Sequence, residues 1–243
     1  MSHAEFIRNF YSQRLAAAAE NRDHYDILDW ASAAAQQARF QVLAEHLTAA
    51  FAVAPALLDV GCGFADLATY LAARRLPARY VGVDLNAELL AAARLAAVRA
   101  ENPALDLRCG DIFTDEHLFA PREFDVVFAS GVFNLRLDNN AAFASNAIRR
   151  LQRFAKHSVV VNFLHRRAAT KYDECFYYSP PAMLAETQSP DWETSLRDDY
   201  LENDFTLIFR RRAIKTNRNA SRCATKPVPD VPQLCDISAT NPT

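Results

Sequence analysis

The stretch LLDVGCGFADL, residues 57–67, decides the fold of this chain. A short apolar run ends at Asp59 and Val60, and Gly61 and Gly63 follow, although the whole chain holds only five glycines. Glycine permits a tight turn and lets a ligand approach the backbone closely. A helix that begins after such a turn presents free N–H groups to an anionic or polar ligand. The stretch is therefore predicted to be a strand, a ligand-binding turn and the start of a helix.

Strands and helices alternate on the C-terminal side of this stretch. Apolar runs predict five strands, over 56–60, 80–84, 105–109, 124–130 and 158–164. Helices are predicted over 65–75, 87–100 and 141–155, whereas the connection 110–123 carries no clear signal. Most of the strand runs are almost continuously apolar, as in strands that are buried on both faces. The alternation is typical of right-handed βαβ units on a parallel sheet.

The two ends of the chain differ from this central pattern. Apolar residues at helical spacing predict N-terminal helices over 3–20 and 32–51. Near the other end a short helix is predicted within 177–188, and the runs 192–201 and 205–211 are predicted to form an antiparallel hairpin. The last residues are polar and Pro-rich and are predicted to be disordered. The predicted division is an N-terminal helical cap over 1–52, a cofactor-binding domain over 53–212 and a tail over 213–243.

Composition argues against several classes of protein. The formal net charge is −2, so no global field favours nucleic acid or an anionic membrane. No apolar run approaches the roughly 20 residues of a membrane span. The N-terminal stretch lacks the apolar core of a secretion signal, so a cytoplasmic location is expected by default. The five cysteines are odd in number and scattered without a CxxC pair, which argues against a disulfide framework and against a zinc site.

The identity of the cofactor depends on two acidic residues. Asp84 ends the second predicted strand, and a carboxylate there can accept hydrogen bonds from both hydroxyls of a ribose. That suits NAD and S-adenosylmethionine (SAM) alike. Asp66, however, stands where the dinucleotide fingerprint has its third glycine, close to where a pyrophosphate would bring negative charge. NAD is therefore disfavoured, because the amino-acid end of SAM tolerates a neighbouring acid better.

Four motifs in order, in 57–67, 80–86, 109–113 and 124–134, resemble the successive motifs of the class I SAM-dependent methyltransferases. The resemblance covers roughly residues 25–211. It implies a Rossmann-like α/β fold: a seven-stranded sheet of order 3-2-1-4-5-7-6, strand 7 antiparallel, with helices on both faces. The predicted hairpin supplies the last two strands. One departure is Ala65, which replaces the third glycine of a G-x-G-x-G loop and is expected to lie in the first helical turn.

The resemblance also implies roles for residues that follow the strands. Gly61 and Gly63 would approach the amino-acid end of SAM, and Asp59 would hold its ammonium group. Further positions are expected at the rest of the cofactor: Asp84 at the ribose, Leu85 at the adenine face, Asp111 and the Ile112 N–H at the adenine edge, and Ser130 and Gly131 at the methionine part and sulfonium.

The remaining candidates each have an alternative interpretation. Arg39 would grip the SAM carboxylate, or it lies on a solvated helix face. His165 follows the fifth strand, where a general base could act, or it is a solvated loop histidine. Tyr25, with Trp30, would close a lid over the site or pack the N-terminal helix. Phe133 and Asn134 are expected to face the mouth of the substrate site.

The predicted reaction is methyl transfer from SAM to a nucleophilic atom of an acceptor. Transfer from a sulfonium requires mainly alignment and exclusion of water, so neither a catalytic triad nor a metal is expected. No motif identifies the acceptor; a small molecule is favoured, a protein is second, and neither nucleic acid nor a membrane is expected. Two other functions stay open: a non-catalytic SAM-binding partner subunit and a nicotinamide-dependent oxidoreductase. The oligomeric state is not predicted.

Overall fold

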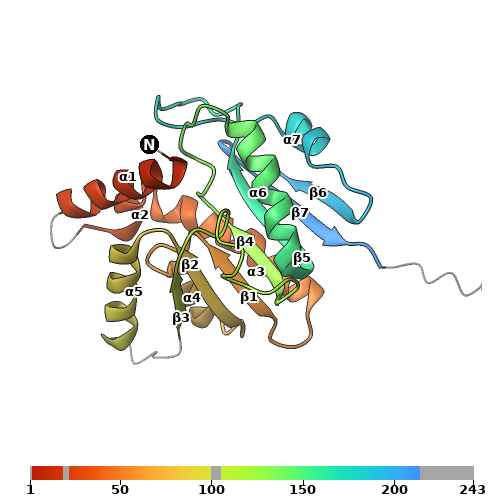
Figure 1. The fold of residues 1–243 in the computed structure, drawn as a ribbon, viewed down its shortest axis with the longest axis horizontal. Helices are drawn as coiled ribbons and strands as arrows, with labels where there is room; N and C mark the ends of the chain where they lie inside the picture. The colour runs from red at the N-terminus through yellow and green to blue at the C-terminus, as the bar shows by residue number, and fades with distance from the viewer. Residues whose placement is uncertain (1, 19–21, 100–104, 214–243) are drawn as a thin grey trace, which may run out of the picture. The chain divides into compact units, whose positions relative to one another are not determined.

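Seven strands form one sheet in the order β3-β2-β1-β4-β5-β7-β6 in the computed structural model (Figure 1). The structure describes residues 2–18, 22–99 and 105–213. Five strands are parallel, and β7 pairs with β5 and β6 in the antiparallel sense. The predicted fold class and strand order are therefore confirmed. The strands are β1 (Ala56–Val60), β2 (Arg79–Asp84), β3 (Asp106–Cys109), β4 (Phe124–Ala129), β5 (Ala155–Leu164), β6 (Trp192–Arg197) and β7 (Asp204–Arg211).

Helices connect these strands and lie on both faces of the sheet. Figure 1 shows α6 in front of the sheet and α3 behind it. The helices are α1 (His3–Ala17), α2 (His24–Ile27), α3 (Ala33–Ala50), α4 (Asp66–Ala73), α5 (Ala87–Arg99), α6 (Asn140–Phe154) and α7 (Pro180–Glu186). Helix bounds agree with the sequence prediction to within a few residues, except that residues 19, 20 and 100 lie outside the described part of the chain.

Alternation along β1 explains how the two faces are filled. Successive side chains of a strand point to opposite faces. Leu57 and Phe128 pack against α3 and α4, whereas Leu58 and Val127 pack against α6. Because both faces are covered, the parallel strands read as continuous apolar runs. Helix α3 belongs to this core, so within residues 1–52 it is α1 and α2 that lie apart from the sheet.

The connection from β3 to β4 contains no helix in its described residues, 110–123. Phe119 anchors it in the core, where its ring meets Phe124 and Phe154 edge to face. Arg150 of α6 holds the start of this connection, because its guanidinium donates to the carbonyls of Ile112 (3.1 Å) and Asp115 (2.6 Å). The connection is therefore held in place, although its sequence shows the periodicity of neither a helix nor a strand.

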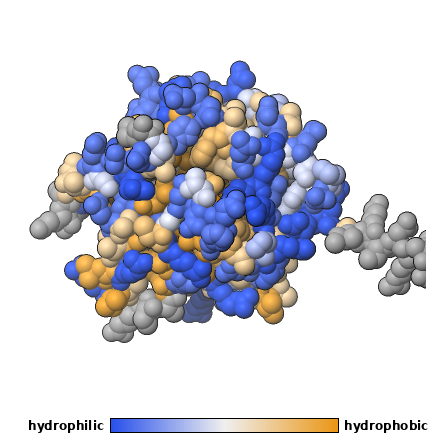
Figure 2. All heavy atoms as spheres, in the orientation of Figure 1, coloured by the Kyte–Doolittle hydropathy of each residue, from blue (hydrophilic) through white to orange (hydrophobic). Residues whose placement is uncertain are grey.

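The predicted hairpin is confirmed as β6 and β7. Cys62, Cys109 and Cys175 are free thiols. The remaining cysteines and nearly all of the predicted tail, 213–243, lie outside the described residues, and the part up to Arg212 forms one unit by itself. Among the described helices, none is long and apolar enough to cross a membrane. Apolar side chains do reach the surface on α5, where Leu95 and Val98 are exposed and orange atoms gather in Figure 2.

Candidate active site

A cavity of about 790 Å³ lies where the carboxyl ends of the parallel strands meet. Ligands of open α/β sheets bind at this edge, near the point where strand order reverses. One side of the cavity, here called the strand-end wall, consists of residues that follow β1 to β4. The other side, called the helix wall, consists of six residues of α1 and its N-cap: Ser2, His3, Ala4, Ile7, Arg8 and Tyr11.

The glycine turn after β1 adopts a left-handed backbone at three alternate residues. Gly61 has φ of 69°, Gly63 has φ of 52° and Ala65 has φ of 58°. A Cβ on Gly61 would lie 2.6 Å from a methyl carbon of Val132, so a side chain is excluded there on two grounds. The expectation for Ala65 was wrong: it is the left-handed N-cap of α4, not a residue of the first helical turn. Its buried methyl packs against Leu90, and such packing offsets the strain of about 1–2 kcal/mol.

Asp84 joins the glycine turn to the end of β2. Its carboxylate accepts hydrogen bonds from the N–H of Gly63 (2.9 Å) and from the N–H of Asn86 (2.8 Å). Burial raises the pKa of Asp84 above its ordinary value, and these backbone hydrogen bonds act in the opposite direction. The carboxylate lines the cavity, so its remaining lone pairs can accept from hydroxyls of a ligand.

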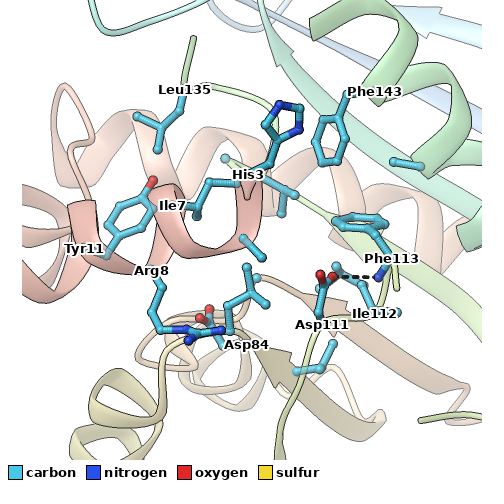
Figure 3. Close-up of a pocket in the computed structure, with 18 of the residues that line it drawn as sticks. His3, Ile7, Arg8, Tyr11, Asp84, Asp111, Ile112, Phe113, Leu135 and Phe143 are labelled. Carbon is cyan, nitrogen blue, oxygen red and sulfur yellow. Dashed lines mark hydrogen bonds between the residues drawn. The ribbon is translucent and has the colours of Figure 1, made fainter. Parts of the chain in front are cut away.

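Asp111 shapes the wall after β3 in the same way. Its carboxylate accepts from the N–H of Phe113 (2.9 Å) and from the hydroxyl of Thr114 (2.8 Å). Figure 3 shows this contact beside Ile112, with both side chains at the lower part of the cavity. Asp111 and Ile112 therefore both line the cavity after β3, one strand away from Asp84.

Buried polar atoms without a hydrogen-bond partner gather near Gly131. Among the described residues they include Trp30 Nε1, Ser130 Oγ and Asn134 Oδ1. Gly131 has φ of 84°, and a Cβ there would lie 3.1 Å from the indole edge of Trp30. Ser130, Gly131 and Trp30 line the cavity. Burying a polar atom without a hydrogen-bond partner costs free energy, so these atoms are suited to bind a polar ligand.

Arg39 reaches this corner from behind Trp30. Its guanidinium carbon lies 4.1 Å from the centre of the Trp30 ring. Its Nε and Nη2 each donate to the Asp204 carboxylate at 2.7 Å, and both side chains are fully buried. Only Nη1 has no partner in the described structure. The alternative of a solvated helix face is wrong, and a two-pronged grip on a ligand carboxylate is also excluded because Asp204 occupies the fork.

Asp59 does not lie among the described residues that line the cavity. Strand alternation explains this, because Val60 faces the cavity and Asp59 therefore faces the opposite side, toward α4 and α5. There its carboxylate accepts from the Tyr80 hydroxyl at 2.6 Å. Burial raises the pKa of Asp59 to about 7.

His165 and Phe133 also differ from expectation in their placement. His165 lines a separate hollow with Ser179 and Pro180, and its Nδ1 accepts from the Arg167 N–H at 2.9 Å. Desolvation lowers the pKa of His165. Phe133 is buried and stacks on another ring of the core at 5.3 Å, because it belongs to the apolar layer under the cavity rather than to its mouth.

Tyr25 and Asn134 are not among the described residues of the cavity wall either. The carbonyl of Tyr25 accepts from the Trp30 N–H at 2.8 Å, so Tyr25 helps to place the indole. Of the residues that the sequence analysis named, nine do meet in this cavity: Trp30, Gly61, Gly63, Asp84, Leu85, Asp111, Ile112, Ser130 and Gly131.

The helix wall was missed by the sequence analysis. Residues 4, 7, 8 and 11 share one face of α1, a spacing that predicted a helix but not what the helix covers. Helix α1 has no buried residue, and polar contacts attach its far end: Arg14 donates to the carbonyls of Ile27 and Asp26 and pairs with Asp29 at 2.8 Å. Near its start, the ring of His3 meets Phe143 of α6 edge to face at 5.7 Å.

Comparisons with known proteins agree with this arrangement. A family model described as a methyltransferase domain matches residues 57–156. A Mycobacterium tuberculosis protein whose name designates it a methyltransferase is 30% identical over 161 residues, which cover 63% of this chain and 91% of that protein.

Two solved structures are similar in fold. One is magnesium protoporphyrin IX methyltransferase of Synechocystis with bound SAM, at a TM-score of 0.63 and 16% identity, covering 87% of this chain and 98% of that one. The other is a SAM-dependent methyltransferase of Clostridium acetobutylicum, at a TM-score of 0.57 and 12% identity, covering 87% of this chain and 100% of that one.

Proposed function

This chain belongs to the class I SAM-dependent methyltransferases, and from that premise we propose that its cavity aligns SAM along the strand-end wall with a small-molecule acceptor under α1. The enzyme is a SAM-dependent methyltransferase. What the proposal adds is the residues that hold the cofactor and the class of acceptor. Neither a nicotinamide-dependent oxidoreductase nor a catalytically inactive binder is needed to explain the site.

The strand-end wall supports the ribose and adenine positions. The Asp84 carboxylate, already oriented by two backbone N–H groups, accepts from the ribose hydroxyls. Leu85 and Ile112 line the cavity on either side of the base, and Asp111 accepts from its amino group. Turn-forming hydrogen bonds hold both carboxylates before the ligand arrives, so little side-chain entropy is lost on binding.

The unpartnered atoms near Gly131 carry the proposal for the amino-acid end. A carboxylate there would accept from Trp30 Nε1, and the Arg39 guanidinium stacked on the Trp30 ring places a positive charge behind it. An ammonium group would donate to Ser130 Oγ. The corner thus offers a donor and an acceptor, which matches a zwitterion in both signs. Arg39 itself is not among the described residues that line the cavity, and Asp204 holds two of its nitrogens.

When bound, SAM supplies a methyl group that is activated by its sulfonium. The protein's own contribution is alignment, which can supply about 7–11 kcal/mol of the barrier. Gly61 and Gly131 allow the backbone to approach the cofactor closely. Helix α1 covers the opposite side of the cavity and excludes water there. That contribution requires no metal ligand and no nucleophilic side chain.

A small-molecule acceptor fits the enclosure better than a protein does. The cavity of about 790 Å³ lies within the range of about 300–1,000 Å³ that is usual for small-molecule sites. Helix α1 covers it, with its face from Ala4 to Tyr11 turned inward. A folded protein could present a side chain to this space only if α1 moved away.

Calorimetric titration with SAM, S-adenosylhomocysteine (SAH) and NAD tests the proposal. The wild type is expected to bind SAM and SAH but not NAD. Trp30→Phe and Ser130→Ala remove one unpartnered group each and are expected to weaken SAH binding by about 5- to 10-fold, as for the loss of one ordinary hydrogen bond. Ser195→Ala, on β6 and outside the cavity, is the matched control. Unchanged SAH affinity in both variants would contradict the placement of the amino-acid end.

A further inference from the structure

The cavity has two sides of different chemistry. Figure 3 shows Asp84 and Asp111 together on one side, and His3, Ile7, Leu135 and Phe143 on the other. The first side is the proposed place of the cofactor. The second side is left for the acceptor, and its side chains therefore indicate what the acceptor is.

Apolar and aromatic groups dominate the acceptor side. Phe143 meets Phe113 edge to face at 5.5 Å, and both rings line the cavity. Ile7 and Leu135 lie across from them in Figure 3. Aromatic walls of this kind favour a flat ring, because ring pairs stack offset or edge to face.

His3 is the ionisable group that the acceptor side supplies. Within the described chain its imidazole has a ring contact with Phe143 but no hydrogen bond or ion pair. Its position is fixed, because Ser2 and Glu5 form a capping box that starts α1 at His3: the Ser2 N–H donates to Glu5 (2.8 Å), and the Glu5 N–H donates to Ser2 Oγ (3.2 Å).

The other ionisable groups of the cavity are less well placed than His3 to accept a proton from the acceptor. Asp84 and Asp111 lie on the cofactor side, where both accept from backbone N–H groups. Burial raises the pKa of Tyr11 far above its ordinary value, so its hydroxyl stays protonated. Arg8 on α1 and Arg150 on α6 carry guanidinium groups, which donate hydrogen bonds and have no acceptor atom. A histidine ordinarily titrates near pH 6.5 and is the usual general base.

We infer that the acceptor is an apolar ring compound that carries a hydroxyl group, and that His3 takes the proton of this hydroxyl. This inference rests on the proposed function. In the step, the hydroxyl oxygen forms a bond to the methyl carbon, and the bond from that carbon to sulfur breaks. The bonding electron pair goes to sulfur, which leaves SAH neutral at that atom, and the hydroxyl proton goes to a nitrogen of His3. The products are a methyl ether, SAH and protonated His3, which returns its proton to solvent.

The test uses three probes that share one ring system: 2-naphthol, 2-naphthylamine and 2-naphthoic acid. Formation of SAH from SAM is measured on the full-length protein at saturating SAM. The wild type is expected to methylate 2-naphthol at least 10-fold faster than the other two. His3→Gln is expected to lower kcat for 2-naphthol by about 100-fold at pH 7, with KM and SAH affinity changed less than threefold. His117→Gln, at an exposed site after β3, is the matched control and is expected to equal the wild type.

The pH profile separates a catalytic from a structural role. The wild-type kcat/KM is expected to rise with pH and then level off, as for a reaction that needs a general base, whereas His3→Gln is expected to keep rising as the naphthol itself ionises. Parallel profiles, or kcat for His3→Gln within threefold of the wild type, would overturn the role of His3. Preference for the amine or the acid, or no turnover of any probe by protein that binds SAH, would overturn the acceptor class. Failure to bind SAM and SAH would instead refute the proposed function.

Discussion

The two walls of the cavity are built in opposite ways. The strand-end wall follows strands that are buried on both faces, and its carboxylates, Asp84 and Asp111, are held by backbone N–H groups. The helix wall belongs to α1, which has no buried residue. It is attached by Arg14 at its far end, by the edge of His3 against Phe143 near its start, and between them by the Ser12 hydroxyl, which accepts from Asn86 Nδ2 at 3.0 Å. Tyr11 and Leu15 add partly buried apolar contacts.

This difference assigns different tasks to the two walls. A preorganised wall suits a ligand that is the same in every turnover, because its polar groups need no rearrangement. A lightly attached helix suits entry of an acceptor and release of products, since covering elements with few buried contacts open at low cost. Under the proposed function, the strand-end wall would account for cofactor affinity, and the helix wall would account for access and for the choice of acceptor.

The largest effect is expected at Asp84. Asp84→Ala removes the proposed acceptor for the ribose hydroxyls and also releases the N–H of Gly63. SAH affinity is expected to fall by about 100-fold, which corresponds to ~2.7 kcal/mol. Calorimetry measures this. Asp106→Ala, which removes an exposed carboxylate on β3, is the control and is expected to bind SAH normally. Equal affinities of the two variants would break the assignment of the cofactor to the strand-end wall.

Asp59 provides a test of the support behind that wall. Its folded-state pKa of about 7 lies above the ordinary 3.8, so the folded protein retains the proton between about pH 4 and 7 while the unfolded chain loses it. The free energy of unfolding therefore falls as pH rises through this window. Asp59→Asn keeps an acceptor for the Tyr80 hydroxyl and is expected to be more stable than the wild type by about 2 kcal/mol at pH 8, with little difference at pH 4.

Urea unfolding of both proteins at pH 4 and pH 8 measures this difference. SAH affinity of Asp59→Asn is expected to stay within about threefold of the wild type, because the carboxylate faces away from the cavity. A stability difference that is the same at both pH values would show that Asp59 is not a buried acid with a raised pKa. A large loss of SAH affinity would restore the ammonium-binding role that the sequence suggested.

Gly131 tests how closely Trp30 packs against the turn after β4. A Cβ there would press on the Trp30 indole at 3.1 Å, and φ of 84° is unfavourable for alanine. Gly131→Ala is expected to lower the free energy of unfolding by about 1–2 kcal/mol and to weaken SAH by about 10-fold. Gly110→Ala, which lacks a positive φ and meets only the flexible end of Leu118, is the control for the change in stability alone, because Gly110 also lines the cavity. A variant of Gly131 that behaves like the control would argue that Trp30 is not packed against the turn.

The smallest effect is expected on the helix wall. Arg14→Ala removes two hydrogen bonds to backbone carbonyls and the ion pair with Asp29. The free energy of unfolding is expected to change by less than about 1 kcal/mol, because the partners are partly exposed. Hydrogen exchange within α1 is nevertheless expected to accelerate, since this attachment holds the helix locally. Arg22→Ala, which removes only a surface pair with Asp26, is expected to leave exchange in α1 unchanged.

The sequence predicted more residues of the strand-end wall than of the helix wall. Gly61, Asp84 and Asp111 each follow a recognisable strand, and parallel strands bring such positions to one edge. Asp59 and Val60 are adjacent in the first strand, and adjacent side chains point to opposite faces of a sheet. This alternation was visible in the sequence and would have placed Asp59 on the face away from the cavity. The partner of Arg39 was not visible, because Asp204 lies 165 residues further along the chain.

Two features depend on tertiary context that no local pattern carries. Ala65 adopts a left-handed backbone that its own preference opposes, because the turn and the packing of its methyl require it there. The apolar face of α1 predicts a helix that covers something, but the periodicity is the same whether it covers a core or a cavity. His3 therefore gave no signal, whereas the seven strands and their order followed from the motifs.

Hydrogen exchange with and without SAH tests the contrast between the two walls most directly. The account predicts that β1, β4 and β5 exchange slowly in both states, that residues 61–65 and 84–86 slow down when SAH binds, and that α1 exchanges fast in the free protein and more slowly once SAH fills the space below it. Exchange in α1 as slow as in the sheet without SAH, or no change at residues 61–65 and 84–86 on binding, would contradict the account.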